Sequence, residues 1–149
     1  MEIMPYSPVF WEDIQKVHDP ARQQELALAE LSDAFLPLSV AAEREDLFDY
    51  RVYVAVQAGT AIGFVAFTED ELAWLYVHPD HQRRGIGRKL AEYALSQMEP
   101  GRKSVEVLFG NVPAKSLYVS LGFTKERIIH GKMPGNESFA VTVWELTFG

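Results

Sequence analysis

A glycine-containing segment after an apolar strand is the part of the sequence whose residue types most directly suggest chemistry. The segment from Val77 to Arg88 reads VHPDHQRRGIGR and leads into a predicted helix. Backbone N–H groups at a helix N-terminus have no intrahelical partner and carry partial positive charge, and glycines let a ligand approach that backbone closely. Arg83 and Arg84 are unfavourable at this end of a helix, by up to about 1 kcal/mol each, unless an anion lies beside them. The segment therefore predicts a site for an anionic ligand.

Two common phosphate-binding templates do not fit this loop. A dinucleotide fingerprint requires glycine three residues after Gly87, where the chain has Leu90, and a P-loop requires a Gly-Lys-Ser/Thr sequence that is absent. What remains is a Gln-x-x-Gly-x-Gly pattern, formed by Gln82, Gly85 and Gly87. It follows a strand that ends in Val-x-Pro.

A second pattern follows after one predicted helix and one predicted strand. It consists of Asn111, Ala114, the Leu-Tyr pair at 117–118 and the Leu-Gly-Phe triplet at 121–123. Together with the glycine loop, it resembles the GNAT acetyltransferase superfamily from about residue 51 to the C-terminus. The resemblance implies direct transfer of an acetyl group from acetyl-coenzyme A to a primary amine of a small molecule, peptide or protein. The alternative is a non-catalytic module of the same fold that binds acyl-coenzyme A.

The resemblance also implies which residues bind the cofactor. The strand ending at Val77 is expected to pair through its backbone with the pantetheine arm, and an N–H near Val77 to polarise the thioester. The loop is expected to bind the pyrophosphate, with the side chains of Arg83, Arg84, Arg88 or Lys89 left for the 3′-phosphate. Asn111 would contact the pantetheine or a bridging water. The full set is Leu75, Tyr76, Val77, Gln82, Arg83, Arg84, Gly85, Ile86, Gly87, Arg88, Asn111 and Tyr118.

Two residues are predicted to move protons. Tyr118 matches the family tyrosine that reprotonates the departing thiolate. An amine with a pKa near 10.4 must first lose a proton, and Glu106 is the predicted base. It lies in an apolar strand, where both faces of a parallel sheet are usually covered and a charge is costly. Glu71, in the acidic turn 69–71, and a water chain are the alternatives.

The charge distribution bears on the acceptor. The net charge is −7, which argues against nucleic acid as a partner. Residues 1–71 hold 14 acids and four bases, whereas four bases fall within residues 83–89. The carboxylates of Glu43, Glu45, Asp46 and Asp49 would attract a cationic amine.

Other features of the sequence bear on cellular location and on metal binding. The chain has no cysteine, no apolar run long enough to cross a bilayer, and no secretory signal at its N-terminus, so a cytoplasmic location is expected. His78 and His81 lack a supporting cluster of ligands, so no metal is expected.

The periodicity of apolar residues predicts an α+β fold in one domain over residues 1–149. Residues 72–77, a helix at 85–98 and residues 104–109 form a crossover unit, so these two strands should run parallel. The resemblance implies a mixed, mostly antiparallel central sheet with a splayed parallel pair and about four flanking helices, and it allows a homodimer through the last strands. Other strands are expected at 3–6, 52–56, 62–67, 123–130 and 138–147, and other helices at 8–17, 19–37, 41–48 and 112–121.

Overall fold

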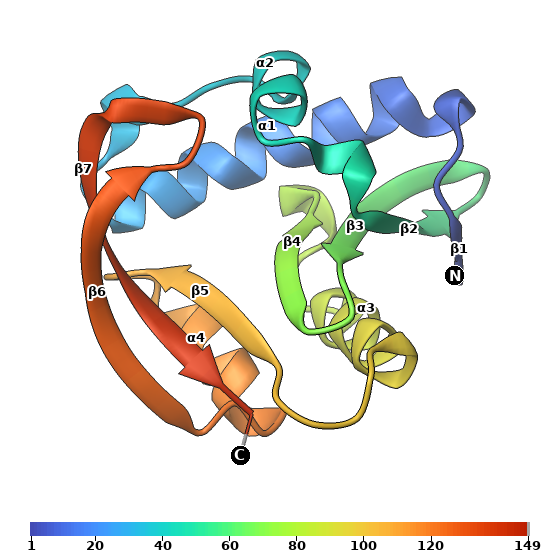
Figure 1. Cartoon of the computed structure of the whole chain (residues 1–149). Helices are drawn as coiled ribbons and strands as arrows, with labels where there is room; N and C mark the ends of the chain where they lie inside the picture. Colours follow the sequence, from blue (N-terminus) through green and yellow to red (C-terminus); the bar gives the residue numbers. More distant parts are fainter. Residues whose placement is uncertain (149) are drawn as a thin grey trace.

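The structure, a computed structural model that describes residues 1–148, is built on a seven-stranded sheet with the order β1-β2-β3-β4-β5-β7-β6. Every neighbouring pair is antiparallel except β4 and β5, which run parallel (Figure 1). The predicted α+β fold class is therefore confirmed. The strands are β1 (Glu2–Pro5), β2 (Arg51–Gln57), β3 (Thr60–Phe67), β4 (Glu71–Val77), β5 (Ser104–Leu108), β6 (Lys125–Met133) and β7 (Asn136–Thr147).

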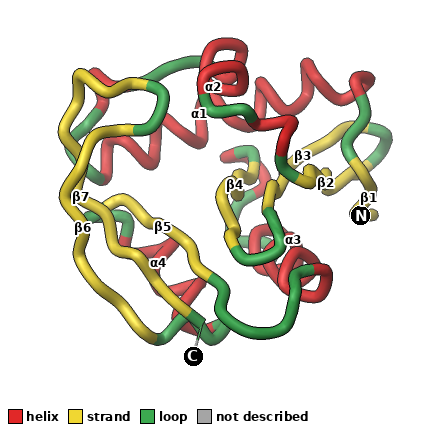
Figure 2. The backbone as a smooth tube through the Cα atoms, in the orientation of Figure 1, coloured by secondary structure: helices red, strands yellow, loops and turns green. Residues whose placement is uncertain are grey.

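Four α-helices cover the two faces of the sheet, as Figure 2 shows. Helices α1 (Trp11–Leu28) and α2 (Leu38–Arg44) bury residues such as Ile14 and Leu38 against one face. Helices α3 (Ile86–Gln97) and α4 (Val112–Ser120) bury Leu90 and Tyr118 against the other. No helix among residues 1–148 is long and apolar enough to span a membrane.

The parallel strands β4 and β5 separate after only two paired positions. Glu71 pairs with Ser104 and Leu72 with Val105, and no further pairs follow. The register between β3 and β4 shifts at Ala73, where β4 carries one extra residue. A bulge of this kind bends its strand and increases the local twist, so the rest of β4 turns away from β5. The predicted splayed pair is thus present.

The first half of the chain corrects two helix predictions. Separate helices were expected on either side of Pro20, but α1 runs through it from Trp11 to Leu28. Proline removes one backbone hydrogen bond, and burial of Ile14, Val17 and Leu26 maintains the helix on both sides. The helix expected to reach residue 37 ends at Leu28; a 3-10 turn at Ser32–Ala34 follows, and α2 begins only at Leu38.

The last two strands are longer than predicted. A loop was expected at residues 132–137, but β6 and β7 pair from Lys125↔Thr147 to Met133↔Asn136. The buried Met133 packs with Val141 and Leu26, which ties this hairpin to the end of α1. Burial of these apolar side chains explains why pairing continues to the turn.

The β2–β3 turn holds an alanine in a strained backbone conformation that a substitution can relieve. Its two central residues, Ala58 and Gly59, have φ values of 52° and 79°, which suits a two-residue hairpin but disfavours alanine. We expect Ala58→Asn to raise the free energy of unfolding by about 0.5–1 kcal/mol, because asparagine tolerates this conformation better. Thermal unfolding measures it. Ala27→Asn, within the regular helix α1, is the control and should destabilise; a loss of stability at both positions would contradict the turn argument.

Candidate active site

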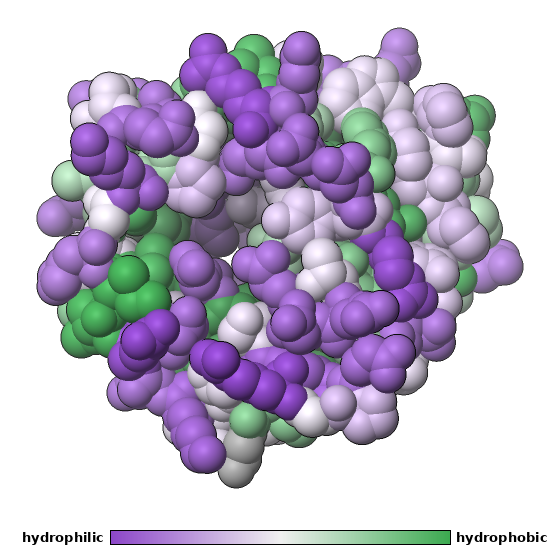
Figure 3. Space-filling model, viewed as in Figure 1, coloured by the Kyte–Doolittle hydropathy of each residue, from purple (hydrophilic) through white to green (hydrophobic). Residues whose placement is uncertain are grey.

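A cavity of about 870 Å³ lies where β4 and β5 separate. Figure 3 shows the surface hollowed near the centre of the face seen in Figure 1. The helix α1 forms one wall, and β4, β5, the glycine loop and α4 form the others. Of the residues predicted to bind the cofactor, all except Arg84 line this cavity. The splay thus brings together residues from the two sequence patterns.

The edge of β4 that faces the cavity has backbone groups that pair with no neighbouring strand. His78 donates its N–H to Ile62 O on β3 over 2.8 Å. Backbone groups alternate in direction along an antiparallel pair of strands. The N–H and C=O groups of Leu75 and Val77 therefore point away from β3, toward the space between β4 and β5. Gln82 Nε2 already donates to Val77 O from that side, over 3.1 Å. An extended ligand can therefore pair with this edge as an additional strand.

The glycine loop leaves open space at the N-terminus of α3. Gly85 is the N-cap residue with φ 79°, and a Cβ built there has no neighbour within 4 Å. A Cβ at Gly87 comes within 3.7 Å only of Val77 Cγ2. Both positions lie on the cavity wall, so a phosphate can approach the helix backbone closely.

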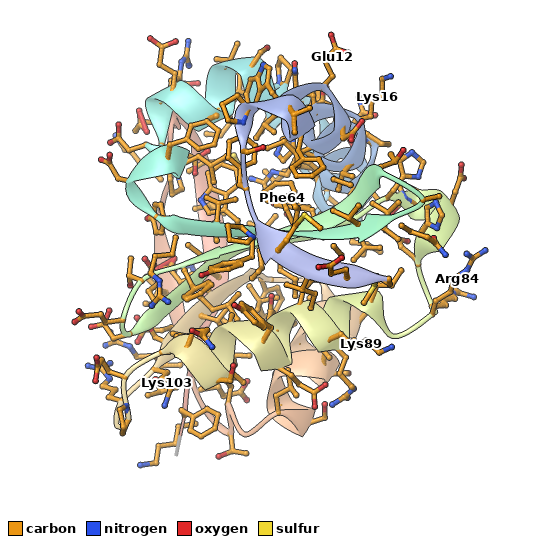
Figure 4. The ribbon with its side chains drawn as sticks, turned by 90° about the vertical axis from the view of Figure 1, so that its right-hand side faces the viewer. Glu12, Lys16, Phe64, Arg84, Lys89 and Lys103 are labelled. Carbon is orange, nitrogen blue, oxygen red and sulfur yellow. The ribbon has the colours of Figure 1, made fainter. Side chains whose placement is uncertain are left out.

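The basic side chains of this loop differ in orientation. Arg88 lines the cavity and donates to Ser120 Oγ over 2.6 Å, which joins α3 to α4. Arg83 has a left-handed φ of 64° and also lines the cavity. Arg84 points away from the molecule (Figure 4) and contacts His81 Nδ1 over 3.4 Å. The structure thus places Arg84 apart from the other predicted cofactor residues.

Tyr118, on α4, and Asn111, the N-cap residue of that helix, both line the cavity. Tyr118 is 6% exposed, and burial, followed by the charge of Glu25, raises the pKa of its phenol. Its hydroxyl has no hydrogen-bond partner among the described residues. Asn111 is 7% exposed, and its Oδ1 accepts from Ala114 N over 3.3 Å as the N-cap of α4. Tyr118 therefore keeps its proton at neutral pH and is available as a donor.

The pattern of the GNAT acetyltransferase domain matches residues 48–125 of the chain. The chain belongs to this family. It is similar to a [ribosomal protein bS18]-alanine N-acetyltransferase from Salmonella typhimurium, with 28% identity over 130 residues, 85% of this chain and 80% of the relative.

Two solved structures share the GNAT fold. A GCN5-related N-acetyltransferase from Rhodopseudomonas palustris has a TM-score of 0.79 and 19% identity, over 99% of this chain and 94% of that one. YncA from Salmonella typhimurium, solved with its cofactor acetyl-CoA, has a TM-score of 0.67 and 19% identity, over 99% and 92%.

Two carboxylates of this acetyltransferase differ in burial from what the sequence predicted. Glu106 was expected on a covered strand, yet its side chain is exposed and lines the cavity, because β4 has turned away from β5. Glu71 was expected in a solvated turn, yet it is half-buried as the first residue of β4. Burial, the nearby Glu106 and Asp70 raise the pKa of Glu71, and a hydrogen bond from Tyr50 opposes this. Both remain predicted as proton acceptors.

Sequence reasoning missed the residues that α1 contributes to this GNAT site. His18, Arg22 and Glu25 line the cavity on successive turns of the helix. Glu25 Oε1 accepts from the Tyr76 hydroxyl over 2.9 Å, across 51 positions of sequence. Only the i, i+3 spacing of Arg22 and Glu25 was visible in the sequence, and such pairs are ordinary on helix surfaces.

Glu45, at the end of α2, makes the stability of this acetyltransferase depend on pH. Burial raises its pKa to about 7, from an ordinary value of 4.5. Because folding favours the protonated carboxyl, its unfavourable contribution appears as pH rises from 4.5 and is complete above about 7. We expect Glu45→Gln to stabilise the fold at pH 8 by about 1 kcal/mol, after allowance for solvent screening, and hardly at pH 4.

Urea unfolding at pH 4, 6 and 8 measures this dependence. Glu43→Gln, an exposed neighbour on α2, is the matched control. An equal effect of Glu45→Gln at pH 4 and pH 8 would show that the carboxyl titrates normally.

Proposed function

We propose that the chain transfers the acetyl group of acetyl-coenzyme A directly to the amine of a cationic acceptor. One observation carries the proposal: the glycine loop, the free edge of β4, the buried Tyr118 and the carboxylate Glu106 all border the same cavity. Membership of the GNAT family supports acetyl-coenzyme A as the donor, since a solved GNAT structure of the same fold contains acetyl-CoA. A non-catalytic module would not need a phenol and carboxylates in that space.

The donor side follows from the backbone. The N–H groups at the start of α3 would bind the pyrophosphate, with Gly85 and Gly87 leaving room for it. Leu75 and Val77 would pair with the extended pantetheine arm. The N–H of Val77, which is directed into the gap, would polarise the thioester carbonyl. Bound acetyl-coenzyme A supplies the activated acyl group; the protein supplies its position.

The remaining steps are proton transfers. Glu106 or Glu71, directly or through water, would take a proton from the acceptor ammonium, so that the neutral amine can attack the carbonyl carbon. A C–N bond forms and the C–S bond breaks. Tyr118 would donate its proton to the departing thiolate, and the excess proton of the new amide would pass through water to the Tyr118 phenolate. The carboxylate would release the proton that it took from the ammonium to solvent. No covalent enzyme intermediate is required.

The acceptor end of the cavity favours a positive charge. Glu45, Glu71 and Glu106 line the cavity, and none of them takes part in the ion pairs found among residues 1–148. Arg22 also lines the cavity and lowers the pKa of Glu45 against the larger effect of burial, but its own ion pair is with Glu25. An adjoining recess of about 250 Å³ shares Glu45 and Tyr50 with the cavity and adds Asp46 and Asp49. Unpaired carboxylates in a concave site raise the local concentration of cations. A small polyamine-like amine and a peptide N-terminus both fit this description.

The test is acetyl transfer measured as thiol release, with a polyamine, an alanine-initiated peptide and a free amino acid as acceptors. We expect turnover with a cationic acceptor and a lower KM above pH 7, where Glu45 is ionised. Exclusive use of a zwitterionic amino acid would contradict the cationic acceptor, and no turnover with any amine would contradict the proposed activity. A homodimer through β6 and β7 stays a prediction, which light scattering can test.

A further inference from the structure

One carboxylate in the cavity wall receives donors from three elements of the fold. Glu25 lies on α1, and its side chain is 23% exposed. Its Oε1 accepts from the Tyr76 hydroxyl on β4 over 2.9 Å and from Arg22 Nη1 on α1. Its Oε2 accepts from Asn111 Nδ2 over 3.3 Å. Glu25 therefore joins α1 to β4 and to the N-cap residue of α4.

Both polar atoms of the Asn111 side chain are engaged within the protein. Oδ1 accepts from Ala114 N at the start of α4, while Nδ2 donates to Glu25. Tyr118 lies seven residues further on, two turns along the helix, and so projects to the same side as Asn111. The orientation of the Asn111 amide thus links Glu25 to the N-terminus of the helix that carries Tyr118.

On the basis of the proposed function, we propose that Glu25 is a positioning residue that holds Asn111, and through it the helix bearing Tyr118, in the arrangement needed for acetyl transfer. Its carboxylate is suited to this role because it only accepts hydrogen bonds, and all three surrounding groups donate. A displacement of about 1 Å at a reacting group can reduce the rate about a hundredfold. Glu25 thus acts on catalysis without contacting the reacting atoms.

The donor and acceptor pattern makes Glu25→Gln a selective change. The glutamine oxygen can still accept from Tyr76 and Arg22, but its amide then faces Asn111 Nδ2 as a second donor. Rotation of the Asn111 amide does not help, because Nδ2 would then face the N–H of Ala114. The substitution therefore breaks the link to α4, keeps the hydrogen bond from Tyr76, and reduces the ion pair with Arg22 to a neutral hydrogen bond.

Exchanging the donor and the acceptor between positions 25 and 111 restores the hydrogen bond between them in the opposite direction. In the Glu25→Gln, Asn111→Asp double variant, the glutamine amide donates to the aspartate, which also caps α4. Total charge is unchanged. We expect Glu25→Gln alone to lower kcat about ten- to hundredfold and the double variant to return to within about threefold of wild type. Glu12→Gln, on the solvent side of α1 (Figure 4), is the control and should leave kcat unchanged.

Rates are measured at a temperature where circular dichroism shows every variant folded, so that lost stability alone does not change kcat. Asn111→Ser provides a second single variant, since serine keeps a cap on α4 but is too short to replace the amide Nδ2 that donates to Glu25. It should be slowed like Glu25→Gln. Unchanged kcat in both single variants, or a double variant as slow as independent effects predict, would overturn the proposal. Wild-type protein that fails to turn over would instead contradict the proposed function.

Discussion

Replacement of both Gly85 and Gly87 by aspartate is expected to weaken acetyl-coenzyme A binding at least about a hundredfold, because juxtaposed like charges cost several kcal/mol. Each new carboxylate would occupy the open space in front of the α3 N-terminus, where the pyrophosphate is expected. Gly85 has a φ of 79°, so a side chain there costs about 1 kcal/mol of backbone strain, which the asparagine control carries as well. The fold should survive this cost, because a Cβ at Gly85 has no neighbour within 4 Å and one at Gly87 meets only Val77 Cγ2 at 3.7 Å. Calorimetry at low and moderate salt measures the affinity.

The matched control replaces both glycines by asparagine, which has the size of aspartate without its charge. An intermediate affinity is expected, and it separates steric filling from charge repulsion. Wild-type affinity should also fall as salt is added, because the ligand is a phosphate anion. Unchanged affinity in the aspartate variant would show that the phosphates do not bind at this loop.

Tyr118→Phe is expected to lower kcat by about 10²- to 10⁴-fold, the usual contribution of a positioned proton donor. Affinity for acetyl-coenzyme A should stay within about threefold, because only one hydroxyl is removed from the cavity wall. The fold should persist, since the ring still packs edge-on against Phe123. Single-turnover kinetics and calorimetry on the same variant measure both quantities.

The control for this substitution is Tyr6→Phe. Tyr6 contacts the ring of Phe48 and lies outside the cavity, so kcat should not change. If Tyr118→Phe kept full turnover, the thiolate would have to be protonated from another source. Binding without turnover by the wild type would favour the non-catalytic alternative.

The parts of the fold that could be predicted from sequence are those governed by local pattern. Alternating apolar residues predicted β2, β3, β4 and β5, because the two-residue period of a strand is visible within a few positions. Gly85 and Gly87 likewise indicated a ligand approach at the start of α3. Pro20 misled this reasoning, because local propensity favours a break and tertiary burial overrides it.

The environment of the carboxylates depended on contacts that no local pattern records. Glu106 was expected to be covered, but the extra residue at Ala73 turns β4 away from β5 and exposes it. Glu71 is more buried than expected: a solvated turn was predicted, but it lies half-buried at the start of β4. The pKa of Glu71 is raised because of that placement.

By itself, the sequence determined the family, the order of most strands and the glycine loop, because each depends on residues close together in the chain. Only the tertiary structure decided how α1 reaches the site. Glu25 meets Tyr76 and Asn111 across 51 and 86 positions of sequence, and such contacts leave no periodic trace. They form because burial of the apolar side of α1 against β3 and β4 fixes where its polar side lies.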